Sequence, residues 1–305
     1  MKAARIHRFG PPEVIVVEEI ARPTPVEGEV LVRVAATGVA SWDAIVREGK
    51  SEVSPQPPLT LGSDLSGTVE TVGPGVAGFQ VGDEVYGVTN PGFCGANAEY
   101  AIAFAGMIAH KPRSLSHIEA ASAPVVAVTA WQMLFEYANV ASGQSVLILG
   151  AAGSVGGYAV QLAVNSGVRV VATGGPADAA YLRGLGAERF LDTKSGQLDD
   201  SLPAVDAVLD LIGGEIAERA LRLVKPGGIL VSVVSTDGLP QRPGVKSVFF
   251  YAEVTTARLD RISELFDQGK LVARVGTVLP LESIRVAHEM LAGAPHERGK
   301  IVLRV

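Results

Sequence analysis

One stretch of the chain joins an apolar run, a glycine-rich turn and an apolar pattern with helical spacing. It reads Val146-Leu-Ile-Leu-Gly150-Ala-Ala-Gly153-Ser-Val-Gly156-Gly157-Tyr-Ala-Val-Gln-Leu-Ala163. Glycines let the backbone turn tightly so that its N–H groups can approach a pyrophosphate, and a helix beginning near Ser154 adds its partial positive charge at the same place. A second apolar strand, Val168 to Thr173, follows as a βαβ unit requires. The pattern favours dinucleotide binding over an ordinary packing turn, with contacts from Gly150, Ala151, Ala152, Gly153, Ser154 and Val155.

The end of the second strand bears on which dinucleotide would bind. NAD-binding folds usually carry Asp or Glu there to accept the ribose hydroxyls, whereas this chain has Gly174 and Gly175. Without that carboxylate a 2′-phosphate is not repelled, which favours NADP (NADPH) as the cofactor. Arg183 or Arg169 could bind the phosphate, or both are simply surface charges, and Asp178 counts against NADP. Gly174, Gly175 and Arg183 are our candidate contacts in this region.

Later strands should complete the cofactor site. Ligands bind at the carboxyl ends of parallel strands, so Ile212 should border the adenine side, with Val233 and Ser235 on the nicotinamide side. The strand from Gly228 to Val234 is expected to form the edge of the sheet. An exposed edge leaves backbone groups open for pairing with a second copy of the chain.

Composition limits the class of protein. With 305 residues, 48% of them hydrophobic, the chain can bury a sizeable core and is expected to form two domains. A net charge of −6 argues against a nucleic-acid partner. The polar, basic start does not resemble a signal peptide, and no apolar run reaches the ~18 residues of a membrane span, so we expect a cytoplasmic protein without a membrane partner. A single cysteine, Cys94, excludes an internal disulfide and a multi-cysteine zinc site.

The pattern of expected secondary structure changes after Pro112. Before it, short segments with strand character are separated by Gly and Pro, as in an irregular antiparallel β domain. After it, strands and helices alternate, which predicts parallel strands with crossover helices and an α/β fold. The expected strands are 29–35, 67–72, 83–88, 146–149, 168–173, 189–191, 207–211, 228–234, 272–275 and 301–305. The expected helices are 118–137, 155–165, 177–184, 215–223, 256–268 and 281–291.

Several separated segments occur in the order typical of one family. They are Gly95 to Tyr100, Lys111 to Ser116, Ala127 to Trp131, the turn at 150–157, Leu223 to Val231 and Arg298 to Val302. The chain resembles the medium-chain dehydrogenase/reductase superfamily, and within it the zinc-free quinone oxidoreductases that include zeta-crystallin. The resemblance implies a GroES-like β-rich catalytic domain from residues 1–123 and 248–305. It also implies a Rossmann doubly wound parallel-sheet domain from residues 124–247, an active site between the two, and a homodimer.

The resemblance also indicates where zinc would bind. Zinc-dependent members use a Cys, a His and a further Cys or Asp at positions that fall here on Ala40, Ser63 and Val125. None of these is a good zinc ligand. The five histidines show no metal-ligand spacing, so we expect no metal and no zinc.

Without a Lewis acid, reduction of a conjugated acceptor is easier than oxidation of an alcohol. We therefore expect hydride transfer from NADPH to a quinone or an α,β-unsaturated carbonyl, with the developing charge stabilised by hydrogen bonds. The resemblance suggests Thr129 near the nicotinamide, although it could instead cap a helix, and Ser63 is the candidate donor to the substrate oxygen. Asp43 is expected to form a structural hydrogen bond.

A pocket for an apolar or flat small molecule is expected around four residues. They are Ala40, Trp42, Phe93 and Phe249, although Trp42 could equally belong to the core. Quinone reductases of this type usually have Asn at the position of Ala40 and often Tyr at that of Ile45. These two differences weaken the expectation that a simple quinone is the physiological substrate. Two other classes also stay open. One is a non-catalytic NADP-binding protein, crystallin-like or regulatory, and the other is a methyltransferase on a similar sheet.

Overall fold

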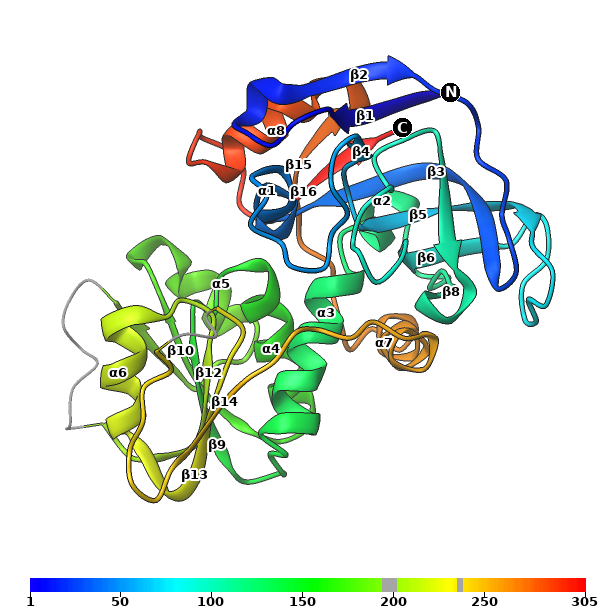
Figure 1. Ribbon diagram of the computed structural model, residues 1–305. Helices are drawn as coiled ribbons and strands as arrows, with labels where there is room; N and C mark the ends of the chain where they lie inside the picture. Colours follow the sequence, from blue (N-terminus) through cyan, green and yellow to red (C-terminus); the bar gives the residue numbers. More distant parts are fainter. Residues whose placement is uncertain (194–201, 235–237) are drawn as a thin grey trace. The chain divides into compact units, whose positions relative to one another are not determined.

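The computed structural model describes residues 1–193, 202–234 and 238–305, and the chain divides into two compact units (Figure 1). The first unit contains Met1–Val125 and Val254–Val305, and the second contains Val126–Glu253. The first is β-rich, whereas the second alternates strands with helices. The architecture is therefore the expected α/β class, a GroES-like β domain with a Rossmann-like parallel sheet.

The first unit contains two sheets. A small sheet has the order β2-β1-β4, and a larger one has the order β15-β16-β3-β5-β6-β8 with β7 also paired to β3. Its strands are β1 (Lys2–Ile6), β2 (Ile15–Glu19), β3 (Glu29–Val39), β4 (Leu59–Thr60), β5 (Asp64–Val72), β6 (Glu84–Val88), β7 (Tyr100–Phe104), β8 (Ile108–His110), β15 (Val275–Pro280) and β16 (Lys300–Arg304). Its helices are α1 (Ser41–Arg47), α2 (His117–Ala121), α7 (Thr256–Asp267) and α8 (Ile284–Leu291).

Both ends of the chain contribute to the larger sheet of the first unit. Strand β16 pairs antiparallel with β3, placing Leu303 opposite Thr37. The two strands share a buried apolar cluster that includes Val39, Ile301 and Leu303. The C-terminal segment is therefore part of the first unit's core, as the blue and red strands of Figure 1 illustrate.

The second unit is built on a six-stranded sheet with the order β11-β10-β9-β12-β13-β14. All of its described neighbours pair in parallel. The strands are β9 (Ser145–Leu149), β10 (Arg169–Gly174), β11 (Arg189–Asp192), β12 (Val205–Asp210), β13 (Val224–Ser232) and β14 (Lys246–Phe249). The helices are α3 (Pro124–Trp131), which begins just before the unit boundary, α4 (Ser154–Asn165), α5 (Ala179–Gly184) and α6 (Gly214–Arg222).

Burial explains why the central strands are almost wholly apolar. Every residue of β9 is buried, as expected for a parallel strand covered by helices on both faces. Helices α4 and α6 lie on opposite faces of the sheet in Figure 1. The strand order reverses direction at β9, between β10 and β12, and this switch point is where ligands of such sheets bind.

Most of the expected strands and helices are present, but three expectations were wrong. Residues 118–137 do not form one helix, because α2 ends at Ala121 and α3 begins anew at Pro124, whose ring suits a helix start; a π-helix follows over Gln132–Tyr137. The strand expected at 272–275 lies instead at Val275–Pro280. The strand at 228–234 is not the sheet edge, because β14 pairs beside β13 and takes that place.

Candidate active site

The glycine-rich turn joins β9 to α4 through an unusually close backbone approach. Gly150 has a φ of +74°, which a residue with a side chain rarely adopts. A Cβ on Gly156 would lie 2.3 Å from the carbonyl oxygen of Gly150 and 2.6 Å from the Cα of Ala151. The first turn of α4 therefore packs directly against the turn, and only glycine fits at position 156.

The backbone N–H groups of this turn fall into two sets. Those of Gly150 and Ala151 donate to Thr173, at 3.1 Å to its Oγ1 and 3.0 Å to its carbonyl oxygen, and that of Gly153 donates to the Gly150 carbonyl at 3.0 Å. The N–H groups that have no acceptor among the described residues are those of Ala152, Ser154, Val155 and Gly156. They lie at the N-terminus of a twelve-residue helix, where unpaired donors and the helix dipole favour an anion.

The end of β10 is closed by a side chain from the next turn. The Asp178 carboxylate accepts a hydrogen bond from the Gly175 N–H at 3.0 Å and is buried. A Cβ on Gly174 would lie 3.1 Å from the Cβ of Asp178, so this position has little room for a carboxylate of its own. The guanidinium carbon of Arg183 lies 5.9 Å from the ring centroid of Phe190. Arg183 of α5 therefore lies near Phe190 of β11, while Gly174 ends β10 in the same unit.

Asp210, which the sequence analysis did not single out, organises the ends of β12 and β13. Its Oδ1 accepts hydrogen bonds from the N–H groups of Ile212 (3.1 Å) and Gly213 (2.8 Å). Its Oδ2 accepts one from the Ser232 hydroxyl at 2.8 Å. A buried carboxylate at the carboxyl end of a parallel strand is the signal that could have revealed it.

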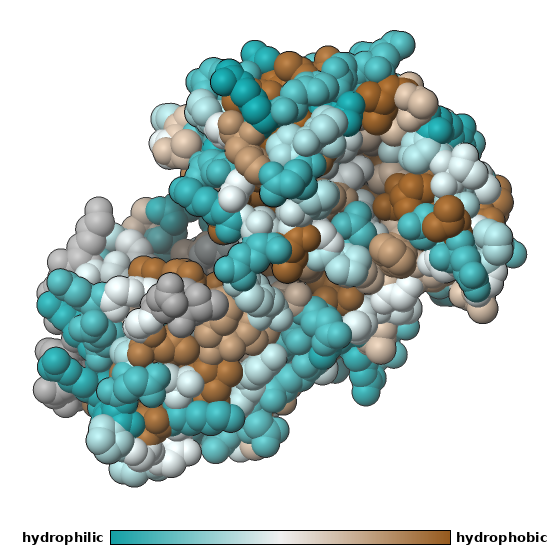
Figure 2. Space-filling view, viewed as in Figure 1, coloured by the Kyte–Doolittle hydropathy of each residue, from teal (hydrophilic) through white to brown (hydrophobic). Residues whose placement is uncertain are grey.

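Apolar side chains are exposed beside this Asp210 network. Ile212 is 46% exposed and Val234 is 44% exposed, and a Cβ on Gly150 would contact Ile212 at 3.2 Å. Figure 2 shows apolar surface on the second unit. The structure therefore brings Gly150 and Ile212 together as expected of one crevice, while Val233 is half-buried and Ser235 lies outside the described residues.

In the first unit, buried carboxylates bind the backbone at two of the three positions where the sequence analysis expected zinc ligands in zinc-dependent members, Ala40 and Val125. Asp43 Oδ2 accepts a hydrogen bond from the Ala40 N–H at 2.7 Å, as expected of a structural role, and Asp64 Oδ1 accepts one from the Val125 N–H at 3.0 Å. Asp64 also forms a 3.0 Å ion pair with Lys300. The side chains at positions 40, 63 and 125 offer no thiolate, imidazole or carboxylate, so they do not fit a zinc ion.

Ser63 and Asp43 carry the reactive polar groups of this region. Ser63 is 4% exposed, and its hydroxyl has no hydrogen-bond partner within the described part of the chain. Burial raises the pKa of Asp43 to about 7, against the lowering effects of the Ala40 N–H and the Lys300 ammonium. The hydroxyl of Ser63 is thus not used by the described part of the chain, and burial favours the protonated form of Asp43.

Two of the expected pocket residues lie together. The rings of Trp42 and Phe93 meet edge to face, with centroids 6.0 Å apart. Phe93 has a φ of +51°, a strained conformation for an aromatic residue. The Cys94 carbonyl next to it accepts hydrogen bonds from Thr89 Oγ1 and Asn90 Nδ2, each at 2.7 Å.

The other expected residues are in the second unit. Phe249 ends β14 and forms an edge-to-face pair with Tyr251, whose ring centroid is 5.0 Å away. Thr129 is buried in α3. The structure thus brings Trp42 and Phe93 together in the first unit, whereas Phe249 and Thr129 belong to the second unit.

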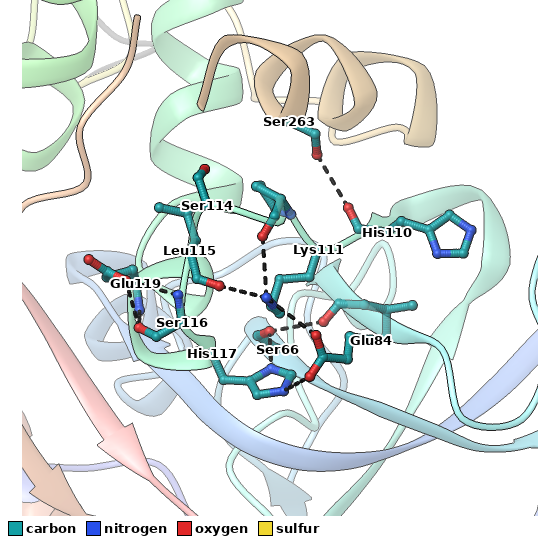
Figure 3. Close-up of polar contacts among 12 residues, drawn as sticks. Ser66, Glu84, His110, Lys111, Ser114, Leu115, Ser116, His117, Glu119 and Ser263 are labelled. Carbon is teal, nitrogen blue, oxygen red and sulfur yellow. Dashed lines mark hydrogen bonds and ion pairs between the residues drawn. The ribbon is translucent and has the colours of Figure 1, made fainter. Parts of the chain in front are cut away.

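His117 forms structural contacts within the first unit. His117 Nδ1 lies 2.8 Å from Ser66 Oγ and its Nε2 lies 3.1 Å from Glu84, which also pairs with Lys111 (Figure 3). This Ser-His-Glu arrangement is not a nucleophilic triad, because Ser66 is completely buried inside β5 and its hydroxyl lies 2.9 Å from the Val85 carbonyl. Within residues 1–193, 202–234 and 238–305, no three His, Cys, Asp or Glu side chains form a group that could hold a metal ion.

Comparison with known proteins places the chain in a family. Residues 26–136 match the family described as "Alcohol dehydrogenase GroES-like domain", and residues 185–303 match "Zinc-binding dehydrogenase". The 2-methylene-furan-3-one reductase of Solanum lycopersicum is 34% identical over 281 residues, which cover 89% of this chain and 70% of that protein. The chain belongs to the medium-chain dehydrogenase/reductase superfamily, in its quinone-oxidoreductase group. Members of this family are oxidoreductases that use a nicotinamide cofactor.

Solved structures of this family have the same fold. The quinone oxidoreductase from Coxiella burnetii superposes with a TM-score of 0.90 at 30% identity, covering 100% of this chain and 99% of that one. A mycobacterial protein solved in complex with NADPH superposes with a TM-score of 0.87 at 28% identity, covering 100% of both chains. The chain also matches polyketide synthase GfsB of Streptomyces halstedii at 36% identity, where it spans only 5% of that much longer protein. Among the described helices, none has the length and apolarity to span a bilayer.

Proposed function

We propose that this oxidoreductase is a zinc-independent, NADPH-dependent reductase that acts on a quinone or an α,β-unsaturated carbonyl. One observation carries the proposal: the turn at 150–156 presents unpaired backbone donors at the start of α4, with glycine where a side chain would collide. Such a turn suits a pyrophosphate. When bound, the cofactor supplies the hydride.

The preference for NADPH over NADH is part of the proposal. The end of β10 has glycines in place of the usual ribose-binding carboxylate, and Arg183 lies on the following helix. The Asp178 carboxylate opposes a 2′-phosphate by its charge, although it is buried and bonded to the Gly175 N–H. The solved relative with NADPH supports the same choice.

The first unit supplies the group that would stabilise the reduced substrate. The Ser63 hydroxyl is nearly buried and has no partner in the described residues, so we assign it as donor to the substrate oxygen, where negative charge develops. The resulting enolate or phenolate is then protonated from solvent. This route needs no metal, which agrees with the poor zinc ligands at positions 40, 63 and 125.

The acceptor would lie against aromatic side chains. Trp42 and Phe93 offer ring surface next to the small Ala40, and a flat conjugated molecule makes its largest contact with such surface. Thr129, in the second unit, is proposed to orient the carboxamide of the nicotinamide. Phe249 is proposed to line the acceptor pocket as a further aromatic side chain. The Solanum lycopersicum relative, a 2-methylene-furan-3-one reductase, supports a conjugated carbonyl as the acceptor class.

A homodimer in the cytoplasm completes the proposal. On the β13 side the edge strand of the six-stranded sheet is β14, so a second copy would pair along Lys246–Phe249 rather than along β13. Size-exclusion chromatography with light scattering measures this directly. A monomer at micromolar concentration would contradict the dimer without affecting the proposed reaction.

The decisive experiment is a turnover screen combined with coenzyme titration. Purified protein is titrated with NADPH and NADH by fluorescence, and oxidation of each is then followed with naphthoquinones and open-chain enones. We expect tighter binding of NADPH and steady oxidation with at least one acceptor class. Binding without consumption would indicate the non-catalytic alternative, equal affinity for the two coenzymes would contradict the NADP preference, and stoichiometric zinc by metal analysis would contradict the metal-free route.

A further inference from the structure

Thr173, the penultimate residue of β10, forms a bridge between the first strand and the glycine-rich turn. Its Oγ1 donates to the Ile148 carbonyl at 3.2 Å and accepts from the Gly150 N–H at 3.1 Å. Its carbonyl oxygen accepts from the Ala151 N–H at 3.0 Å. Both N–H groups at the start of the turn are therefore held by this one residue, which is 1% exposed.

The backbone N–H groups of the turn fall into a set that bonds within the protein and a set that is left for a ligand. Gly150 and Ala151 use their N–H groups to fix the backbone, whereas Ala152, Ser154, Val155 and Gly156 keep theirs without an acceptor in the described chain. Donors that are already fixed in place bind an anion with a smaller loss of conformational entropy. The geometry of the free set thus depends on the anchoring of the first set.

We propose that Thr173 is a positioning residue that preorganises the turn for the pyrophosphate of a dinucleotide. This inference rests on the proposed cofactor role of residues 150–156. Thr173 itself does not touch the anion in this account, because its hydroxyl is already engaged on both sides by Ile148 and Gly150. Its effect passes through the backbone of the turn.

The chain offers an isosteric test with a rescue. Thr173→Val keeps the shape and the β-branch but removes the hydroxyl, so the half-buried Gly150 N–H loses its acceptor. We expect the dissociation constant for NADPH to rise about tenfold, equivalent to about 1.4 kcal/mol, and KM for NADPH to rise by a similar factor while kcat at saturating NADPH stays near the wild-type value. Thr173→Ser restores the hydroxyl and should restore the affinity.

Ser145→Ala is the matched control. Ser145 is also buried and its hydroxyl also forms a bond, at 2.9 Å to Asp206, but it lies at the opposite end of β9 from the turn. The Ser145→Ala substitution should lower the melting temperature of the protein while leaving the affinity for NADPH unchanged. Equal weakening by Ser145→Ala and Thr173→Val would reduce Thr173 to a stability role and overturn the proposal.

Two further results would also overturn the role of Thr173. One is wild-type affinity in a folded Thr173→Val protein, and the other is failure of Thr173→Ser to restore affinity. These outcomes are distinct from failure of the proposed function, which shows as absence of NADPH and NADH binding by the wild-type protein itself.

Discussion

The Nζ of Lys300 lies 3.0 Å from Oδ2 of Asp64, and both side chains are almost completely buried. Lys300 begins the last strand, β16, and Asp64 begins β5, so the ion pair joins two distant parts of the chain within the first unit. Asp64 also binds the Val125 N–H, just before the chain passes into the second unit. This ion pair therefore holds together strands β5 and β16, which are far apart in sequence, at the point where Asp64 also binds Val125.

Removing the cation of this pair should destabilise the protein strongly. Lys300→Met leaves the Asp64 carboxylate buried without its partner, which costs about 3–5 kcal/mol of the free energy of unfolding. Adding Asp64→Asn, which can still accept from the Val125 N–H, should recover part of that loss. Chemical denaturation of the two variants measures the effect. Lys225→Met, which removes a more exposed ion pair with Asp206, is the control and should cost under about 1 kcal/mol; an equal cost would contradict the role of burial.

Asp43 should make stability fall as the pH rises. Its pKa is about 7 in the folded protein against 3.8 for a free aspartate, so between these values the folded state holds a proton that the unfolded state releases. The contribution is therefore fully present below about pH 4 and is lost progressively up to about pH 7, by at most about 1.4 kcal/mol per pH unit. Asp43→Asn keeps an acceptor for the Ala40 N–H but cannot titrate. Its unfolding free energy should lack this slope, and an unchanged slope would contradict the assignment.

His288 should produce the opposite dependence. It is fully buried, its Nδ1 lies 2.7 Å from Arg47 Nη1, and burial followed by the Arg47 charge lowers its pKa to about 3. The unfolded state takes up a proton near pH 6.5 and the folded state does not, so stability is full above pH 6.5 and falls as the pH drops towards 3. His288→Gln should weaken this acid slope in denaturation curves.

Between about pH 4 and 6.5 the titrations of Asp43 and His288 change the unfolding free energy in opposite directions. The wild-type protein can therefore show little net pH dependence in this window even if both assignments are correct. The comparison of Asp43→Asn with His288→Gln separates the two groups, because removing one leaves the slope of the other. If both variants kept the wild-type dependence of unfolding free energy on pH, the assignments of Asp43 and His288 would both be contradicted.

Phe93 can be tested without damaging the loop that carries it. Its φ of +51° suits glycine, so Phe93→Gly relieves strain while removing the ring that meets Trp42. We expect a folded protein whose KM for a naphthoquinone rises about tenfold, equivalent to about 1.4 kcal/mol of lost contact, with KM for NADPH unchanged. Asn139→Gly relieves a similar strain, at a φ of 48°, in the second unit and is the control. An unchanged quinone KM in Phe93→Gly would exclude the ring from the pocket.

Ser63 is tested by removing its hydroxyl. Ser63→Ala should lower kcat/KM for the acceptor about 10-fold to 100-fold, because one donor to the developing oxyanion is lost. Binding of NADPH, measured by fluorescence, should not change, since the proposed contacts of the cofactor lie in the second unit. Wild-type kcat/KM in this variant would remove Ser63 from the mechanism.

The sequence predicted the nucleotide-binding half in detail. The run from Val146 to Leu149 is β9, the helix expected near Ser154 begins there, and β10 follows where the apolar pattern placed it. These elements depend on short-range periodicity and on glycines at fixed spacing, which are local properties of the chain. The sequence did not reveal β14, because four residues beyond a long irregular segment carry too little periodicity, and so the sheet edge was assigned to the wrong strand.

What the chain determined by itself is the order of its elements, the glycine-rich turn and the unsuitability of Ala40, Ser63 and Val125 as zinc ligands. Tertiary structure alone decided that Thr173 anchors the turn, that Asp210 joins two strand ends, and that Asp43 is buried near Lys300. The physical reason is that hydrogen bonding and burial are set by partners brought together through folding: Asp64 and Lys300 are 236 residues apart in sequence and 3.0 Å apart in the folded chain.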